Sequence, residues 1–183
     1  MEDVTSREIE EKNAEKTSEL WNTLKTIFWA FVLALVLRTF VFEPFYIPSA
    51  SMEPTLYPED RILVSKVDYL FSPPSRGDVI VFKYPLDPSV DYIKRIIGLP
   101  GEVIEIQNGL VFINGEALEE NYIIQHEGYD FGPLQVPEGM YFVMGDNRND
   151  SSDSRYWGPL EQSLIVGEAK VIYWPPSRIM LIK

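Results

Sequence analysis

The hydrophobic pattern divides the chain into a polar N-terminal stretch, one long apolar segment and a region of short alternating runs. Residues 1–19 carry charges of both signs and almost no apolar positions, which is typical of a solvated tail or helix. Residues 27–37 are continuously apolar, and the wider window 20–42 contains only Lys25 and Arg38 as charged residues. A helix of about 20 residues spans a bilayer. The pattern therefore predicts a charged tail over 1–19 and a transmembrane anchor helix over 20–42.

A cleaved signal peptide is the main alternative for this segment, since it is also N-terminal and apolar. Here the preceding tail is long and net acidic, and the stretch Val41-Phe-Glu-Pro-Phe45 offers no pair of small residues for cleavage. We therefore predict an uncleaved anchor. Basic residues before the apolar segment outnumber those directly after it, which favours a cytoplasmic tail. Residues 43–183 would then form a single extracytoplasmic domain.

C-terminal to residue 56 the pattern changes to short β-branched runs separated by turn residues. The expected strands are 61–67, 78–84, 90–97, 103–106, 110–113, 141–144 and 164–174. Asn-Gly pairs at 108–109 and 114–115 are strong hairpin signals. We predict a mainly β, antiparallel domain with a small inserted sub-domain over about 102–140. Its polar segment 116–138 is expected to be an excursion or a lid.

Composition excludes several classes of function. A net charge of −12 disfavours nucleic acid as a partner, because such binding needs a basic surface. The chain has no cysteine, which excludes thiol catalysis, disulfides and thiolate metal sites. Any Ser-His-Asp triad or His-rich metal site would depend on the single histidine, His126, which we predict to be an exposed loop residue. We expect no metal and no organic cofactor.

Two serines between prolines follow the apolar segment. Pro48 and Pro54 restrict the backbone on either side of Ser49, Ala50 and Ser51, so the hydroxyls are expected in a rigid turn. A rigid turn suits a nucleophile. A Ser/Pro linker between an anchor and a domain would have the same composition, and these residues alone leave both interpretations open.

Lys94 lies in a predicted strand whose period-two alternation places it on the same face as Tyr92 and Ile96. Most lysines are exposed, so a solvated lysine at a sheet edge is one interpretation. The other is a buried lysine that loses its charge, because burial lowers the pKa of an ammonium group. A neutral amine can act as a general base for a serine hydroxyl.

The loop 145–158 is dense in Asp, Asn, Ser and Arg. A plain polar loop has this composition. A calcium loop would need oxygen ligands at alternating positions, and Asp146, Asp150 and Asp153 do not match that spacing. The sequence from Asn149 to Ser151 also matches the frequent glycosylation acceptor pattern.

Four motifs in this chain resemble the sequence boxes of the type I signal peptidases, in the family's order and behind a membrane segment. They are Pro48-Ser-Ala-Ser-Met-Glu-Pro-Thr-Leu56, Arg76-Gly-Asp-Val-Ile-Val-Phe82, Asp91-Tyr-Ile-Lys-Arg-Ile-Ile-Gly-Leu-Pro-Gly101, and Gly145-Asp-Asn-Arg148 with Asp153-Ser-Arg-Tyr-Trp-Gly158. The resemblance implies a membrane-bound serine endopeptidase of β-sheet type. It would remove signal peptides after small residues (Ala-x-Ala) through an acyl-enzyme, outside the cytoplasmic membrane.

The resemblance also assigns roles to individual residues. It implies that Ser51 is the nucleophile and Lys94 the general base of a Ser/Lys dyad. It implies that the Ser49 hydroxyl and the backbone amide of Ser51 form the oxyanion hole. Donors aimed at a developing oxyanion are commonly worth several kcal/mol.

Further residues are implied by the same resemblance. Ser151 would orient Lys94, and Asp153 and Arg155 would form a supporting ion pair. The residues expected at the substrate pockets are Phe45, Ile47, Leu56, Ile62, Val81, Tyr92 and Ile93. The implied partners are signal peptides of exported preproteins, membrane lipid and the neighbourhood of the protein translocation machinery.

Two rival functions stay open at this point. A self-cleaving repressor-type protease uses the same Ser/Lys chemistry, but it normally accompanies a DNA-binding domain, and this chain has an acidic tail and an apolar span instead. A catalytically silent β-scaffold tethered to the membrane would not need both Ser51 and Lys94. Labelling of Ser51 by an acylating inhibitor would distinguish a protease from the silent scaffold.

Overall fold

The computed structural model describes residues 2–123 and 128–182, with side chains from residue 19 onward. His126 lies outside the described residues. The chain forms two units, Met1–Val41 and Phe42–Lys183.

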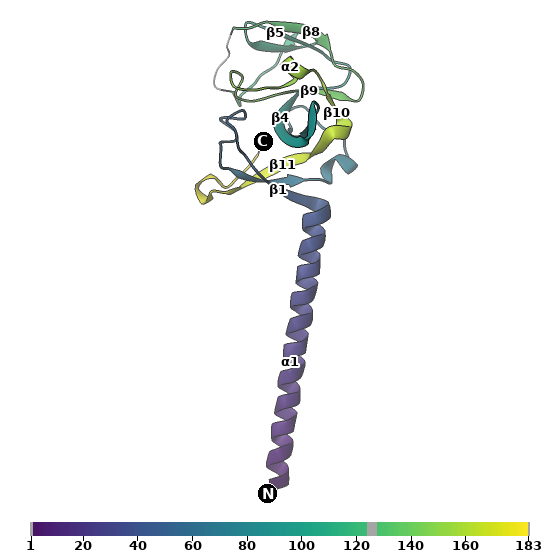
Figure 1. Cartoon of the computed structure of the whole chain (residues 1–183), viewed down its shortest axis with the longest axis vertical. Helices are drawn as coiled ribbons and strands as arrows, with labels where there is room; N and C mark the ends of the chain where they lie inside the picture. The colour runs from purple at the N-terminus through teal and green to yellow at the C-terminus, as the bar shows by residue number, and fades with distance from the viewer. Residues whose placement is uncertain (1, 124–127, 183) are drawn as a thin grey trace. The chain divides into compact units, whose positions relative to one another are not determined.

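The first unit is helical. Helix α1 (Glu2–Val36) continues without a break from the charged stretch into the apolar one, and a π-helical turn, η1 (Leu37–Val41), follows it (Figure 1). The segment Glu19–Val41 is long and apolar enough to cross a membrane, with a mean hydropathy of 1.9. Helical backbone thus ends one residue before the predicted limit, because Phe42 already belongs to a strand.

The second unit contains an eight-stranded sheet in which all neighbouring strands are antiparallel. Its strands are β1 (Phe42–Tyr46), β2 (Arg61–Ser65), β3 (Val79–Tyr84), β4 (Asp87–Gly98), β9 (Met140–Met144), β10 (Leu160–Glu161), β11 (Ile165–Trp174) and β12 (Met180–Leu181). The order is β1-β2-β11-β3-β4-β9-β10, and β12 pairs with β11. Short helical turns complete the unit: η2 (Asp68–Leu70), α2 (Ser154–Trp157), η3 (Gln162–Leu164) and η4 (Pro176–Arg178).

Strand β1 was not predicted from the sequence. Its aromatic residues resemble a membrane-interface belt, and Pro44 argues against a central strand. The structure places this segment at the edge of the sheet, where a missing N–H is tolerated, with Pro44 opposite Leu63 and Phe45 opposite Ile62. The strand therefore fixes the start of the turn that carries Ser51.

A second sheet lies within the range 102–140, for which the sequence predicts a small sub-domain. Its strands are β5 (Val103–Gln107), β6 (Leu110–Ile113), β7 (Glu116–Ala117) and β8 (Phe131–Gln135), in the order β7-β6-β5-β8. Asn108 and Asn114 have φ angles of 49° and 52°, and the glycines after them have 81° and 86°. Positive φ at both central residues is what a type I′ hairpin turn requires, so both Asn-Gly predictions are confirmed. Figure 1 shows β5 and β8 at the end of this unit beyond β4 and β9.

Three hydrophobic clusters hold the second unit together. One of them joins the two sheets through Ile97, Ile104 and Phe142, all fully buried. Gly98 lies at this junction, and an added Cβ would approach the Ile104 Cδ1 atom to 2.5 Å. Another cluster contains Met52, Leu56 and strand residues from β2, β3, β4 and β11. This second cluster lies beneath the candidate site.

Candidate active site

The turn between β1 and β2 is packed onto the core and is not a flexible linker. Its ends are joined because the Ile47 amide donates to the Asp60 carbonyl at 2.9 Å. Met52 and Leu56 have no exposed surface and anchor the turn in the cluster below. Ser51 sits directly before this anchor and retains 9% of its surface. The two prolines and two buried apolar residues thus hold a serine at the surface in one conformation.

Strand β4 brings Lys94 to this serine. The lysine is 3% exposed, and its Nζ lies 2.8 Å from the Ser51 Oγ. Nζ also donates to the Ile93 carbonyl at 2.7 Å and lies 5.4 Å from the centre of the Tyr92 ring. The buried position, rather than the solvated one, is therefore the correct interpretation of this lysine.

Burial lowers the pKa of Lys94 from its ordinary value to about 8. The negative charges of Asp153 and Asp146 oppose this effect and raise the pKa, while Arg155 lowers it further. At pH 7 roughly a tenth of the amine is therefore uncharged, and this fraction rises with pH. An uncharged amine within hydrogen-bond distance of a hydroxyl has the geometry of a general base.

The loop that begins at Gly145 is organised by a buried carboxylate, Asp153. This side chain caps α2, accepts from the Gly145 amide at 3.0 Å, and pairs with Arg155 through a Nε–Oδ1 distance of 2.7 Å. Ser151 also donates to Asp153, at 2.7 Å. Among the described residues no hydrogen bond joins Ser151 to Lys94; Ser151 instead binds Asp153, whose negative charge acts on the lysine.

Asn147 connects this loop to the serine turn. Its amide nitrogen donates to the Ser51 carbonyl at 3.1 Å, and its side-chain Nδ2 donates to the Ala50 carbonyl at 3.2 Å. Sequence reasoning missed this residue, because an asparagine in a polar loop gives no signal of a long-range backbone contact. Two adjacent carbonyls of the turn are held by one residue.

A buried ion pair lies directly behind Lys94. Arg95 donates to Asp146 through Nε at 2.8 Å and through Nη2 at 2.7 Å, and both side chains are 1% exposed. Thr55 of the serine turn donates to the same carboxylate. The alternation of β4 places Lys94 and Arg95 on opposite faces, so one strand supports the turn and the loop together. The sequence signalled this alternation but not the pairing.

An open cavity of about 330 Å³ lies beside Ser51 and Lys94. It is lined by Pro48, Ser49, Ser51, Val90, Asp91, Tyr92, Ile93, Lys94, Asp150 and Ser152. Of the predicted pocket residues, Tyr92 and Ile93 line this cavity. The hydroxyl oxygens of Ser49 and Ser51 are 3.5 Å apart.

The other predicted pocket residues do not line the cavity. Ile47, Leu56, Ile62 and Val81 are at most 2% exposed and belong to the cluster beneath the serine turn, and Phe45 packs against that cluster. Their apolar character, which suggested pockets, serves the core here. Ile47, Leu56, Ile62 and Val81 present almost no surface to a substrate in this conformation, whereas Phe45 is partly exposed.

The acidic side chains of the loop are not arranged as metal ligands. Asp146 and Asp153 are each paired with an arginine. Among the described side chains, those of residues 19–123 and 128–182, no group of three or more His, Asp or Glu could hold a metal ion. The calcium-loop interpretation therefore has no support in the described part of the chain.

Comparisons with known proteins show that the chain is similar to signal peptidases. The family model "Signal peptidase, peptidase S26" matches residues 20–174. Signal peptidase I of Leptolyngbya laminosa is 49% identical over 170 residues, which cover 88% of this chain and 83% of that protein. The probable signal peptidase I-2 of Synechocystis sp. is 43% identical over 183 residues, 96% and 84% of the two chains. The crystal structure of a signal peptidase I from Enterococcus faecalis matches with a TM-score of 0.46 and 38% identity, over 52% of this chain and 95% of that one.

Proposed function

The chain belongs to the signal peptidase family, peptidase S26, and we propose that Ser51 and Lys94 are the catalytic dyad with which it removes signal peptides. Membership makes the chain a serine endopeptidase. The observation that carries the proposal is the 2.8 Å separation between the Lys94 Nζ and the Ser51 Oγ in a buried setting. His126 is not required, because the amine supplies the base.

The proposed reaction begins with the neutral Lys94 amine accepting the proton of the Ser51 hydroxyl. The Oγ attacks the scissile carbonyl carbon, and the carbonyl oxygen becomes an oxyanion. Collapse of this intermediate breaks the C–N bond. The new amine terminus of the mature protein takes its proton from the Lys94 ammonium, and the signal peptide stays bound as an ester of Ser51.

Deacylation repeats the steps with water as the nucleophile. Lys94 accepts a proton from the water, the ester bond breaks, and the Ser51 oxygen recovers its proton from the lysine. In both half-reactions the backbone amide of Ser51 and the Ser49 hydroxyl are proposed to donate to the oxyanion. The 3.5 Å between the two serine hydroxyls supports this role for Ser49.

The shape of the cavity supports a preference for small residues. Its apolar wall is formed by Pro48, Val90 and Ile93, and Ile93 is part of the buried cluster beneath. A shallow, closely backed wall accepts alanine and excludes large side chains. We therefore propose cleavage after Ala-x-Ala sites.

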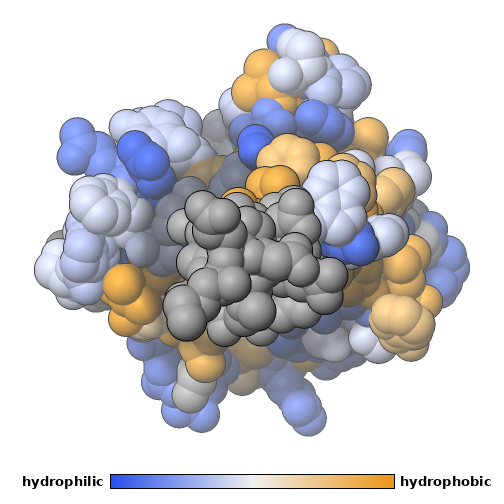
Figure 2. Space-filling model, turned by 90° about the horizontal axis from the view of Figure 1, so that it is seen from below, coloured by the Kyte–Doolittle hydropathy of each residue, from blue (hydrophilic) through white to orange (hydrophobic). Residues whose placement is uncertain are grey.

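The membrane arrangement is part of the proposal. The apolar segment Glu19–Val41 would anchor the enzyme in the cytoplasmic membrane with one span and leave Phe42–Lys183 on the extracytoplasmic side. Signal peptides would reach the enzyme near the translocation machinery. The second unit also exposes apolar side chains such as Trp174, Ile179 and Leu181, which suits contact with lipid, and Figure 2 shows exposed hydrophobic groups among hydrophilic ones.

The proposal is tested by cleavage of a preprotein with an Ala-x-Ala site in detergent. Wild type is expected to cut at that site, and Ser51→Ala is expected to leave it intact because no nucleophile remains. Ser163→Ala, which alters an exposed serine, is the matched control and should cut at the wild-type rate. N-terminal sequencing of the product locates the cut. Continued cleavage by Ser51→Ala would reject Ser51 as the nucleophile.

Replacing Ser49 by alanine tests the oxyanion hole. Losing one donor to the oxyanion is expected to lower kcat about 100-fold, with KM little changed, because the contact strengthens only in the transition state. Ser152→Ala is the control, since Ser152 lines the same cavity. Steady-state kinetics on a peptide with the cleavage site give both constants. An unchanged kcat for Ser49→Ala would remove this residue from the mechanism.

A further inference from the structure

The connection between β7 and β8 docks on the catalytic part of the second unit. The sequence suggested an excursion or lid here, but both described ends of this connection contact arginines of β4 and of the loop that begins at Gly145. The contacts are Glu120 with Arg148, Tyr122 with Arg95 at 4.1 Å from ring centre to guanidinium, and Tyr129, whose hydroxyl accepts from Arg155 at 2.7 Å. Three arginines beside the site are therefore held by one segment of the small sheet.

The contact between Glu120 and Arg148 is a buried, bidentate ion pair. Arg148 donates to both carboxylate oxygens of Glu120, through Nη1 at 3.0 Å and through Nη2, and both side chains are 1% exposed. The Tyr122 hydroxyl also donates to this carboxylate at 2.7 Å. Buried pairs contribute little net stability, because desolvation offsets the attraction. The burial of both Glu120 and Arg148 is better explained if the pair fixes the position of the loop.

Arg148 connects Glu120 to the turn that carries Ser51. Its Nε donates to the Gly145 carbonyl at 3.2 Å, and Asn147, the residue before it, holds the carbonyls of Ala50 and Ser51. The Gly145 amide in turn donates to Asp153, one of the two carboxylates whose charges act on Lys94. Glu120 is thus two contacts away from the Ser51 carbonyl, through Arg148 and Asn147, and it is linked to Lys94 less directly, through Gly145 and the charge of Asp153.

We propose that Glu120 is a positioning residue of the reaction, which fixes Arg148 and so holds Asn147 against the backbone of the nucleophile Ser51. It lies in the small sheet's connection, outside the four catalytic motifs. The inference rests on the proposed function of Ser51 and Lys94. The small sheet then has a defined part in catalysis, since it supplies the support for the catalytic loop.

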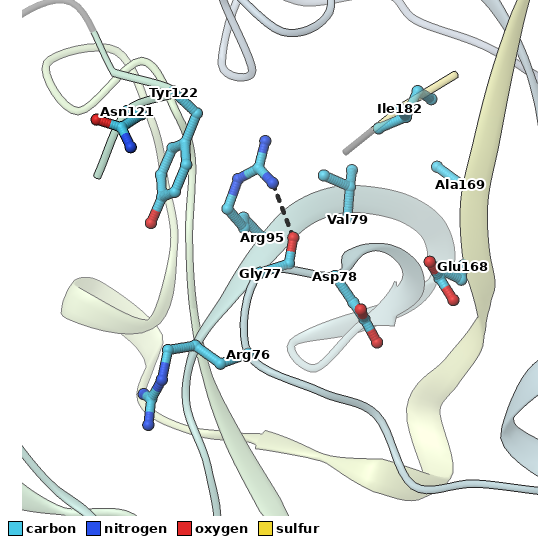
Figure 3. Close-up of a pocket in the computed structure, with 10 residues that line it drawn as sticks. All are labelled: Arg76, Gly77, Asp78, Val79, Arg95, Asn121, Tyr122, Glu168, Ala169 and Ile182. Atoms are coloured by element: carbon cyan, nitrogen blue, oxygen red, sulfur yellow. Dashed lines mark hydrogen bonds between the residues drawn. The ribbon is translucent and has the colours of Figure 1, made fainter. Parts of the chain in front are cut away.

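The neighbouring Tyr122 makes this support rigid. Figure 3 shows its ring beside the Arg95 guanidinium, whose Nη1 donates to the Gly77 carbonyl at 2.7 Å. Arg95 is the partner of Asp146, which precedes Asn147. The connection therefore holds the catalytic loop from two sides, through Arg148 and through Arg95. Loss of the Glu120 contact alone should loosen the loop without releasing it.

The test compares Glu120→Gln with Glu119→Gln, which removes the same charge one residue away at an exposed position. With a peptide containing an Ala-x-Ala site, Glu120→Gln is expected to lower kcat about 10-fold and to leave KM within about 2-fold, because the loop and not the cavity is displaced. Glu119→Gln is expected to match wild type. Equal kcat values for the two variants would overturn the proposal.

A second readout does not depend on substrate. NMR titration of the Lys94 side chain in the substrate-free enzyme should show a different pKa in Glu120→Gln from that in wild type. Movement of the loop changes the burial that lowers this pKa, and it changes the distances to Asp153 and Asp146, which raise it, and to Arg155, which lowers it. An unchanged titration would overturn the proposal. Absence of cleavage by wild type would instead reject the proposed function and leave this readout intact.

Glu120→Gln leaves a buried arginine without this carboxylate and can unfold the protein. The double variant Glu120→Gln/Arg148→Met removes both charges and should recover the melting temperature. If positioning is the role, its kcat stays about 10-fold low, because methionine cannot donate to the Gly145 carbonyl. Recovery of kcat together with the melting temperature would show a purely structural pair and overturn the proposal.

Discussion

Lys94→Met is expected to abolish cleavage and to raise the melting temperature of the enzyme. The loss of activity follows from losing the amine that lies 2.8 Å from the Ser51 hydroxyl and is its proposed base. The gain in stability follows from burial, since the wild-type lysine is 3% exposed and its pKa is lowered to about 8. Loss of activity together with a higher melting temperature would show that Lys94 serves catalysis and does not stabilise the fold.

The size and sign of the gain follow from the two pKa values of Lys94. The ordinary pKa of a lysine is 10.5, and that of Lys94 in the folded protein is about 8, a difference that corresponds to roughly 3 kcal/mol at about 1.36 kcal/mol per unit. Below pH 8 the lysine is charged in both states, and the folded protein bears the full desolvation penalty. Between pH 8 and 10.5 the unfolded chain binds more protons, so wild-type stability rises with pH. The advantage of Lys94→Met is therefore largest at neutral pH and disappears above pH 10.5.

Thermal unfolding of Lys94→Met at pH 7 and pH 10 measures the stability part. A gain of up to about 6–12 °C is expected at pH 7, at about 2–4 °C per kcal/mol for a chain of this size. Lys83→Met is the control, because the Lys83 side chain is 43% exposed and should change stability little. A melting temperature that falls by many degrees in Lys94→Met would contradict a destabilising buried lysine.

The same pKa sets the dependence of wild-type activity on pH. Only the neutral amine accepts the Ser51 proton, so kcat/KM should rise with pH and reach a plateau above an apparent pKa near 8. A bell-shaped pH profile of kcat/KM with its maximum near pH 6 would require a general base other than Lys94.

The sequence alone predicted most of the sheet, because its signals are local. Runs of β-branched residues located the strands around Lys94 and Val79, and the Asn-Gly pairs located both turns of the small sheet. Strand β1 was missed because its aromatic residues continue the apolar segment and Pro44 is a poor strand residue. Only its pairing with β2, at a sheet edge, makes it a strand.

The residues of the candidate site that belong to sequence motifs could be predicted. The contacts that depend on tertiary packing could not. Motif resemblance indicated Ser51 and Lys94, which the structure brings together. It also assigned Leu56 and Ile62 to pockets, yet both have no exposed surface. Periodicity tells which face of a strand a residue occupies but not whether that face meets a cavity or the core. The contacts of Asn147 with a turn nearly one hundred residues earlier depend on the whole topology.

Asp146→Asn is expected to cause a large loss of stability. The substitution keeps the shape of the side chain but leaves the buried Arg95 guanidinium without this carboxylate, and breaking a buried pair in this way costs about 3–5 kcal/mol. Thr55 loses its acceptor charge as well, so the serine turn is affected directly. The melting temperature should fall by about 6–20 °C, at about 2–4 °C per kcal/mol. Calorimetry or far-UV circular dichroism measures it.

Asp91→Asn is the matched control for this change. Asp91 pairs with Lys83 at 2.8 Å, but the two side chains are 32% and 43% exposed, and an exposed pair is worth about 0–1 kcal/mol. A loss for Asp146→Asn no larger than that of Asp91→Asn would show that the buried pair is not held as the structure describes.

The double variant Arg95→Met/Asp146→Asn separates the stability of this pair from its geometry. Removing both charges from the interior should restore most of the melting temperature, since well-packed neutral residues replace buried pairs at little cost. Activity should stay low, because Asp146 also binds Thr55 and precedes Asn147, the residue that holds the Ala50 and Ser51 carbonyls. A stable and inactive double variant would mean that the charges are kept inside to fix the loop against the nucleophile. A stable and fully active one would leave that task to Glu120, Arg148 and Asn147 alone.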